Sequence, residues 1–348
     1  MSGVGAVDLA VAQRADTARA SARRTLVAAV AAAALAAATA ASLTLGAVHI
    51  PLSDVLDALL GRADAGPLRQ IVLELRLPRT VEAIAVGAAL GVAGALLQGA
   101  LANPLASPDV IGVTGGAGFG AILILLVFPS SIALLPAGAL LFGLLAAALV
   151  FLVAWTGPNP GGIARLILAG IAVSALFSAA MSALMAWRPD RVPSAVSFLV
   201  GGLTTSGWSQ LEVVWPYLAA GFALALTLVR PLDRLALGDD VAASLGARPR
   251  AIRLGAGVAA ALLAASAAAL AGLVAFVGLV VPHVVRLAAG SASATFVVPV
   301  AGLCGAALLL AGDTLARTVV APIELPVGPL MVLLGVPLFL WLLRRAVS

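Results

Sequence analysis

The sequence contains no lysine, and all 20 of its basic residues are arginine. A phosphate-binding P-loop needs a lysine after its glycines to neutralise the β- and γ-phosphates of a nucleotide. The chain therefore cannot hydrolyse ATP through a P-loop of its own. Any ATP-driven work must be done by a separate subunit.

Charged residues of any kind are scarce, at 10% of the 348 residues, whereas hydrophobic residues make up 62%. An ordinary soluble domain carries about 25% charged residues, so this chain could not cover a water-facing surface. The net charge of +5 would suggest a nucleic-acid partner in a soluble protein. Here we assign it to arginines beside a lipid bilayer, and we expect no nucleic acid.

Cysteine and histidine are nearly absent. The single cysteine, Cys304, cannot form a disulfide within the chain, and the two histidines, His49 and His283, lie far apart in the sequence. Such spacing argues against a metal site. We expect no catalytic residues, no metal and no cofactor.

What the chain has instead is a series of long apolar runs. Most reach roughly 18 residues, the length that a helix needs to cross a hydrocarbon core of roughly 30 Å, and they lack the alternating polarity of barrel strands. We therefore expect an all-α polytopic membrane protein with about ten transmembrane helices, of which the eighth is short enough to be a broken or half-buried helix. The candidate spans are residues 25–48, 80–101, 110–128, 132–155, 163–187, 211–229, 251–270, 274–287, 296–318 and 327–343.

Arginines predict the orientation of these spans. Residues 1–24 form a polar segment rich in arginine, and the apolar run after it is longer than the roughly 7–15 residues of the apolar h-region in a signal peptide. Because arginine is enriched in cytoplasmic loops, we place this segment and the basic loop at about 230–253 in the cytoplasm. Ten spans return the C-terminus to the cytoplasmic side. We expect residues 25–345 to form one transmembrane domain.

The loop between the first two spans lies outside the cell in this topology, yet it is rich in arginine. Such residues have two explanations: their side chains snorkel to the membrane interface, or they dock an acidic partner. Composition leaves both explanations open. The arginines of this loop are Arg62, Arg69, Arg76 and Arg79.

Small residues and one charge pair mark the spans themselves. The glycine-rich stretch 112–120 resembles a dinucleotide fingerprint, but that motif needs a preceding strand, so we predict close helix packing here and at the glycine stripe 87–94. Asp313 and Arg317 stand four residues apart on one helical face and can pair. The other acids near the spans, such as Glu82, lie at span entrances. The chain therefore lacks the unpaired mid-membrane carboxylate that a proton relay usually needs.

Two segments at the cytoplasmic side have both a plain and a functional interpretation. Asn103-Pro104-Leu105 is either a simple turn or a constriction at the inner mouth of a pathway. Residues 237–246 predict a short helix with acids at its N-terminal end and Gly246 as its stop. Its apolar positions recur every four residues, which suits either a solvated helix or an interface.

A family resemblance connects these segments. The chain resembles the FecCD-type permease family of type II ATP-binding-cassette importers for iron-siderophores, haem and cobalamin, over nearly its whole length from about residue 45. The matching motifs include Leu75-Arg-Leu-Pro-Arg79-Thr80, Val86-Gly-Ala-Ala-Leu90, Gln98, Asn103-Pro-Leu-Ala106, Gly112-Val, Leu168-Ala-Gly170, Gly201-Gly202, Leu235-Ala-Leu-Gly238, Leu245-Gly246, Gly278-Leu-Val-Val-Pro-His283-Val-Val-Arg286-Leu287, Asp313, Arg317, Glu324-Leu-Pro-Val-Gly328 and Gly335-Val-Pro337.

The resemblance implies a fold like that of a cobalamin-importer permease, in the plasma (inner) membrane of a bacterium. It also implies a second permease subunit, identical or paralogous, a cytoplasmic dimer of ATPase subunits, and an extracytoplasmic substrate-binding protein. We expect a permease that carries ferric siderophores. A haem or cobalamin permease is the alternative within the family, and an ion-coupled secondary carrier or a non-transporting scaffold would be alternatives outside it.

The resemblance assigns residues to three roles. Positions that face carboxylates on the binding protein match Arg76, Arg79 and Arg317. The cytoplasmic gate matches Asn103 and Leu105 together with Ile163 and Ala164, where apolar residues replace the family's hydroxyl residues and predict an apolar seal. The ATPase-coupling segment matches Leu237, Gly238, Asp239, Asp240, Val241, Leu245 and Gly246.

Overall fold

The computed structural model describes residues 4–46, 48–62, 66–156, 163–203, 207–321 and 323–347, and no strand occurs within these ranges. Its helices are α1 (Val4–Thr44), α2 (Leu52–Leu59), α3 (Pro67–Gln70), α4 (Leu77–Ala100), α5 (Val113–Val127), α6 (Leu135–Trp155), α7 (Ile163–Trp187), α8 (Val192–Val200), α9 (Trp208–Leu235), α10 (Asp239–Ser244), α11 (Pro249–Ala271), α12 (Val277–Ala289), α13 (Ala294–Thr318) and α14 (Val327–Val347). Short turns of π- or 3₁₀-helix join some of them: η1 (Ile71–Arg76), η2 (Pro108–Ile111), η3 (Pro129–Leu134) and η4 (Pro189–Arg191).

Ten of these helices coincide with the ten predicted spans. By length and composition, seven segments of the described chain are long and apolar enough to cross a membrane, and α5, α12 and α14 provide shorter apolar helices. The short eighth span is α12, with 13 residues. The prediction of an all-α polytopic membrane protein is confirmed.

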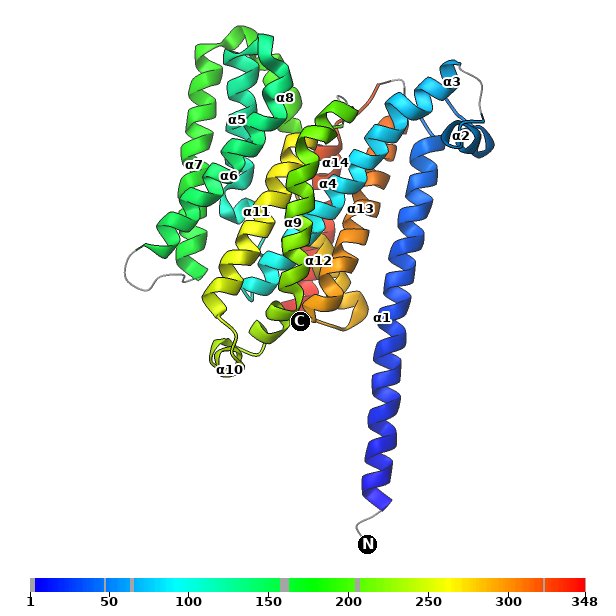
Figure 1. The fold of residues 1–348 in the computed structure, drawn as a ribbon, viewed down its shortest axis with the longest axis vertical. Helices are drawn as coiled ribbons and strands as arrows, with labels where there is room; N and C mark the ends of the chain where they lie inside the picture. The colour runs from blue at the N-terminus through cyan, green and yellow to red at the C-terminus, as the bar shows by residue number, and fades with distance from the viewer. Residues whose placement is uncertain are drawn as a thin grey trace.

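Helix α4 lies in the middle of the bundle, packed against α13, α11, α12 and α9 (Figure 1). Glycines allow its neighbours to approach closely. A Cβ atom on Gly87 or Gly91 would overlap backbone atoms of α13, and one on Gly94 would overlap the Gly278 carbonyl of α12. The close packing predicted for this glycine stripe is therefore present, as expected where small residues line a helix interface in a membrane.

The glycine-rich stretch 112–120 packs in the same way against α6. A Cβ atom on Gly116 would overlap the Phe142 carbonyl, and one on Gly120 would overlap the Gly138 carbonyl. Gly112 itself has a φ of +73°, a conformation that L side chains rarely adopt, at the point where η2 ends and α5 begins. This stretch is helix packing, as predicted, and forms no nucleotide-binding loop.

Helix α1 is continuous from Val4 to Thr44, so the polar segment before the first predicted span is helical within the described residues. Its later part packs against α13, and its first turns extend beyond the rest of the bundle (Figure 1). Arg23 of α1 donates hydrogen bonds to the carbonyl oxygens of Leu287 (2.9 Å) and Ala288 (2.7 Å). These are carbonyls at the C-terminal end of α12 that have no partner within their own helix.

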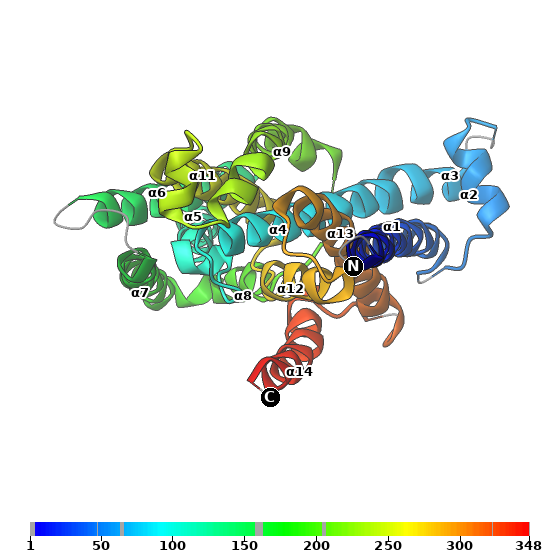
Figure 2. The same ribbon diagram turned by 90° about the horizontal axis from the view of Figure 1, so that it is seen from below.

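Short helices distinguish the two ends of the bundle. Helices α2 and α3 lie at one end and α10 lies at the other, and both chain termini are toward the latter (Figure 1). We call these the α3 end and the α10 end. Viewed along the bundle, α9 and α14 lie on opposite faces of the row formed by α1, α13 and α4 (Figure 2).

Candidate functional site

Charged side chains at the α3 end form one cluster. Arg79 of α4 donates from Nη2 to Oδ1 of Asp313 on α13 at 2.9 Å, and from Nη1 to Oε2 of Glu324 at 2.8 Å. Asp313 also pairs with Arg317, one turn further along α13, at 3.2 Å between Oδ2 and Nε. The predicted pair of Asp313 and Arg317 is thus present, with Arg79 as an additional partner. A buried carboxylate held between two guanidinium groups has the compensation that burial of a charge requires.

The other donors of this cluster reach α1. Arg317 Nη2 donates to Ser42 Oγ at 3.0 Å, and the same hydroxyl shares a hydrogen bond of 2.8 Å with Thr80 of α4. Arg76 Nη1 donates to the carbonyl oxygen of Leu43 at 2.7 Å. The cluster therefore joins α1, α4 and α13 at one level of the bundle.

The three arginines predicted to dock a partner lie inside this cluster. Arg76 is 6% exposed and Arg317 is 7% exposed, whereas the Glu324 side chain is 42% exposed. The exposed member of the cluster is therefore a carboxylate. Docking remains a prediction, and Arg79, with a side chain 11% exposed, is the least buried of the three arginines.

Glu82 is a buried acid whose environment sequence reasoning missed. It lies in the second turn of α4, is 0% exposed, and its Oε1 accepts a hydrogen bond of 3.1 Å from the backbone N–H of Gly207. Gly207 directly precedes α9, so the carboxylate lies beside the positive end of that helix dipole. Glu82 thereby connects α4 to the start of α9.

The segment predicted as a gate begins as a tight turn after α4. Asn103 Oδ1 accepts a hydrogen bond of 2.9 Å from the backbone N–H of Leu105, the side-chain turn that asparagine favours. Leu105 is exposed, and so is Ala164 in the first turn of α7. The side chain of Ile163 lies outside the described part of the structure. The turn is confirmed, and its role as a gate remains a prediction.

Gln98 connects α4 to α12 one turn before the gate segment. Its Nε2 donates to the carbonyl oxygens of Gly278 (3.3 Å) and Leu279 (3.1 Å), and its Oε1 accepts a hydrogen bond from Arg286. The side chain is buried. The sequence analysis named Gln98 only as part of the family resemblance. Its hydrogen-bond partners could not be predicted, because they lie about 180 residues away in the chain.

Helix α10 forms where the coupling segment was predicted. Its C-terminal end has the hydrogen bonds of a Schellman motif: Ala247 N–H donates to the Ala242 carbonyl at 2.9 Å, and Gly246 N–H donates to the Ala243 carbonyl at 3.0 Å. Gly246 has the required positive φ of +76°. The apolar side chains predicted as an interface stripe, Leu237, Val241 and Leu245, are 59%, 48% and 56% exposed.

Arg253 of α11 holds α10 against the bundle. Its Nη1 and Nη2 donate to the two carboxylate oxygens of Asp239 at 2.8 and 2.7 Å, and its Nε donates to the carbonyl oxygen of Ala100 at 3.1 Å. The hydrogen bonds from Arg253 hold the pKa of Asp239 below its ordinary value. Ala100 is the last residue of α4.

Asp233, near the end of α9, caps the start of α13. Its carboxylate accepts hydrogen bonds from the Ser293 hydroxyl at 3.1 Å and from the backbone N–H of Thr295 at 3.2 Å. The N–H of Ala294 and the Thr295 hydroxyl donate to it as well. A carboxylate at a helix N-terminus satisfies free N–H groups and complements the helix dipole.

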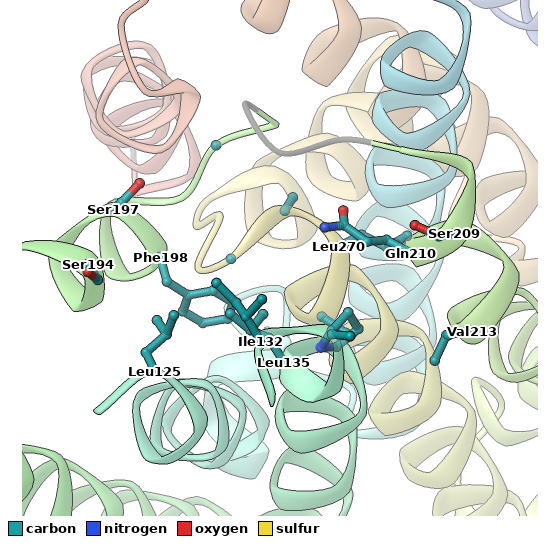
Figure 3. Close-up of a pocket in the computed structure, with 16 residues that line it drawn as sticks. Leu125, Ile132, Leu135, Ser194, Ser197, Phe198, Ser209, Gln210, Val213 and Leu270 are labelled. Carbon is teal, nitrogen blue, oxygen red and sulfur yellow. The ribbon is translucent and has the colours of Figure 1, made fainter. Parts of the chain in front are cut away.

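A cavity of about 580 Å³ lies near the α3 end, between the first turn of α6, α8, the start of α9 and the end of α11 (Figure 3). Serine hydroxyls and one amide provide its polar groups, and the ring of Phe198 lies among the apolar side chains that face them. Within the described residues its lining carries no charge. The labelled lining residues are Leu125, Ile132, Leu135, Ser194, Ser197, Phe198, Ser209, Gln210, Val213 and Leu270.

Comparisons with known proteins identify the class. A family model described as the FecCD transport family matches residues 34–345. The Fe(3+)-citrate import system permease protein YfmE of Bacillus subtilis is 36% identical over 305 residues, covering 87% of this chain and 90% of that protein. The Fe(3+) dicitrate transport system permease protein FecD of Escherichia coli is 39% identical over 306 residues, covering 87% and 93%.

Two further matches support the same class. The hemin transport system permease protein HmuU of Yersinia pestis is 40% identical over 282 residues, covering 79% of this chain and 83% of that protein. Among solved structures, an inward-facing conformation of a metal-chelate type ABC transporter superposes with a TM-score of 0.82 at 30% identity, covering 92% of this chain and 99% of that chain.

The apolar spans, together with the superposition on a solved ABC transporter structure, indicate the membrane-spanning subunit of a transporter. This chain belongs to the FecCD transport family, the permease subunits of ATP-binding-cassette importers. It is a multi-pass membrane protein and a transport subunit rather than an enzyme. ATP hydrolysis belongs to a separate ATPase.

Proposed function

We propose that this permease carries ferric chelates of the siderophore or citrate type. The observation that carries the proposal is the match, over most of both chains, to permeases named for ferric citrate. Haem is the second candidate, because the hemin permease of Yersinia pestis is 40% identical. The cavity lining of hydroxyl, amide and apolar groups suits the uncharged faces of either ligand.

We infer that the α10 end faces the cytoplasm of a bacterial cell and that the α3 end faces outward. The α10 end carries the arginines of the loop that contains α10, and both termini are toward it (Figure 1). Excess arginine marks cytoplasmic loops. The membrane is then the plasma membrane, and both termini are cytoplasmic.

The α10 end presents a surface for a cytoplasmic ATPase. The exposed apolar side chains of Leu237, Val241 and Leu245 form one stripe on and beside α10, and an amphipathic helix of this kind binds in a hydrophobic groove. ATP-driven closure of an ATPase dimer would move α10 and reorient the helices around the path. Asn103, Leu105, Ile163 and Ala164 would close that path at the cytoplasmic side.

The α3 end presents a surface for an extracytoplasmic binding protein. Its charged cluster combines three arginines with two carboxylates and so has a net positive charge, and an acidic group of the partner would pair with Arg79 in place of Glu324. The binding protein would supply most of the substrate recognition, and a second permease subunit, identical or paralogous, would complete the path.

Uptake into proteoliposomes tests the substrate proposal. The chain is reconstituted with its cognate ATPase and binding protein, and the vesicles are offered ⁵⁵Fe-labelled citrate and hydroxamate chelates, haem and cobalamin in parallel. The proposal predicts ATP-dependent accumulation of a ferric chelate. Accumulation of haem alone would support the second candidate, and accumulation of cobalamin alone would contradict both.

A further inference from the structure

The guanidinium group of Arg253 joins the ends of two helices that lie far apart in the sequence. Two of its nitrogen atoms donate to Asp239, the first residue of α10, and the third donates to Ala100, the last residue of α4. The Arg253 side chain is 17% exposed, whereas that of Asp239 is 52% exposed. This set of hydrogen bonds between Arg253, Asp239 and Ala100, which we call the joint, is therefore anchored in the bundle at Arg253 and extends outward to α10.

This arrangement matches the electrostatics of both helix ends. The last carbonyl groups of α4 carry partial negative charge and have no partners within their helix, and the Asp239 carboxylate is a full negative charge. One cation satisfies both. Because guanidinium is planar and binds carboxylate with two parallel hydrogen bonds, it fixes an orientation that an ammonium group cannot.

The covalent connections of α10 pass through residues that have no side chain. Glycines lie on both sides of the helix, Gly238 with a φ of +97° and Gly246 with a φ of +76°, and a Cβ atom on either would meet nothing within 4 Å. Glycine has the widest backbone freedom of any residue. Side chains are therefore the route by which α10 would transmit a displacement to the bundle, through the buried Ala242 and through the hydrogen bonds of Arg253.

We propose that Arg253 is a positioning residue that transmits movement of α10 to the turn after α4, where Asn103 and Leu105 lie. The inference rests on the proposed function, in which α10 contacts the ATPase. Ala100 is three residues before Asn103, and Ala102 between them has a φ of +45°, unusual for a residue other than glycine. A pull on the Ala100 carbonyl acts directly on this bent segment.

The test measures substrate taken up per ATP hydrolysed, in proteoliposomes that contain permease, ATPase and binding protein. In Arg253→Gln the stripe of α10 remains, so the ATPase co-purifies and hydrolyses ATP, but uptake per ATP falls by roughly three- to thirtyfold, the range for residues that carry coupling between sites. Arg230→Gln is the matched control, because it removes an exposed arginine from the same end of the bundle. An unchanged ratio in Arg253→Gln would overturn the proposal.

Two more variants separate the contacts of Arg253. Asp239→Asn, at a half-exposed position, weakens the joint without disturbing the bundle, and it carries the test if Arg253→Gln does not fold: a ratio equal to the wild type would overturn the proposal. The exchange Asp239→Arg with Arg253→Asp restores the ion pair, but aspartate cannot donate to the Ala100 carbonyl, so the ratio stays low. Full recovery by the exchange would exclude the link to α4.

Failure of the proposed function has a different signature. If α10 does not contact the ATPase, wild-type permease fails to retain the ATPase, or Val241→Asp with Leu245→Asp leaves the complex intact. If only the role of Arg253 is wrong, the wild-type complex assembles and transports, and the variants of Arg253 and Asp239 transport with the same uptake per ATP.

Discussion

Arg79 and Asp313 stand 234 residues apart in the sequence, and their side chains meet at 2.9 Å between α4 and α13. The pair lies among Arg317, Glu324 and the hydroxyl of Ser42. It joins the central helix of the bundle to the helix that packs closely against it through glycines. The first effect of these charges is therefore to stabilise the packing of α4 against α13 within the permease.

Asp313→Asn should destabilise the permease strongly. The change leaves Arg317 buried without its carboxylate partner, and breaking a buried ion pair costs about 3–5 kcal/mol. Thermal unfolding of the purified protein in detergent measures the loss as a lower Tm. Glu324→Gln is the control, because an exposed pair contributes at most about 1 kcal/mol; equal Tm values for Asp313→Asn and the wild type would contradict the role given to the cluster.

Glu324→Gln should also tighten binding of the extracytoplasmic binding protein. The change removes the carboxylate that competes for Arg79, so a carboxylate of the partner binds more readily, by up to about 1 kcal/mol and most strongly at low salt. Surface plasmon resonance at two salt concentrations measures it. Unchanged affinity at low salt would count against docking at Arg79. Glu324→Gln is a cleaner test than Arg79→Glu, because the latter also breaks the ion pair between Arg79 and Asp313.

Gly91→Ala should destabilise the bundle, whereas Gly99→Ala on the same helix should not. A Cβ atom on residue 91 would overlap the Ala301 carbonyl of α13, but one on residue 99 would meet only the side chain of Leu232 at 3.8 Å. Overpacking costs about 1–3 kcal/mol, and alanine in place of a helical glycine gains about 0.5–1 kcal/mol. Similar Tm values for the two variants would show that α4 and α13 are not packed through their glycines.

Val241→Asp combined with Leu245→Asp should release the ATPase. Both side chains are about half exposed, so carboxylates there do not disturb the bundle, but they cannot enter an apolar groove without a large desolvation cost. Co-purification from detergent measures retention of the ATPase, and Tm checks that the permease is folded. A folded double variant that still retains the ATPase would exclude α10 as the contact.

The number of spans, the short eighth helix and the glycine packing could be predicted from the sequence, because each depends on local composition and on helical geometry. The helix of residues 239–244 could be predicted for the same reason: acids at its start and Gly246 after its end are local signals. The pairing of Asp313 with Arg317 needed only their spacing of four residues.

The remaining contacts could not be predicted, because they join distant parts of the chain. Nothing near Arg253 in the sequence indicates that it meets Ala100, and nothing near Asp233 indicates that it caps α13. The sequence shows that the loop between the first two spans is rich in arginine. The burial of Arg76, however, depends on the carbonyl groups of Leu43 and Val48, which only the fold brings to it.

In this account the permease transports only when a separate ATPase subunit hydrolyses ATP. The most direct test of this claim is uptake of a ferric chelate by proteoliposomes that contain permease and binding protein, with and without the cognate ATPase. The account predicts accumulation only when ATPase and ATP are both present, and no effect of a protonophore on it. Accumulation without the ATPase, abolished by the protonophore, would contradict the account and indicate an ion-coupled carrier.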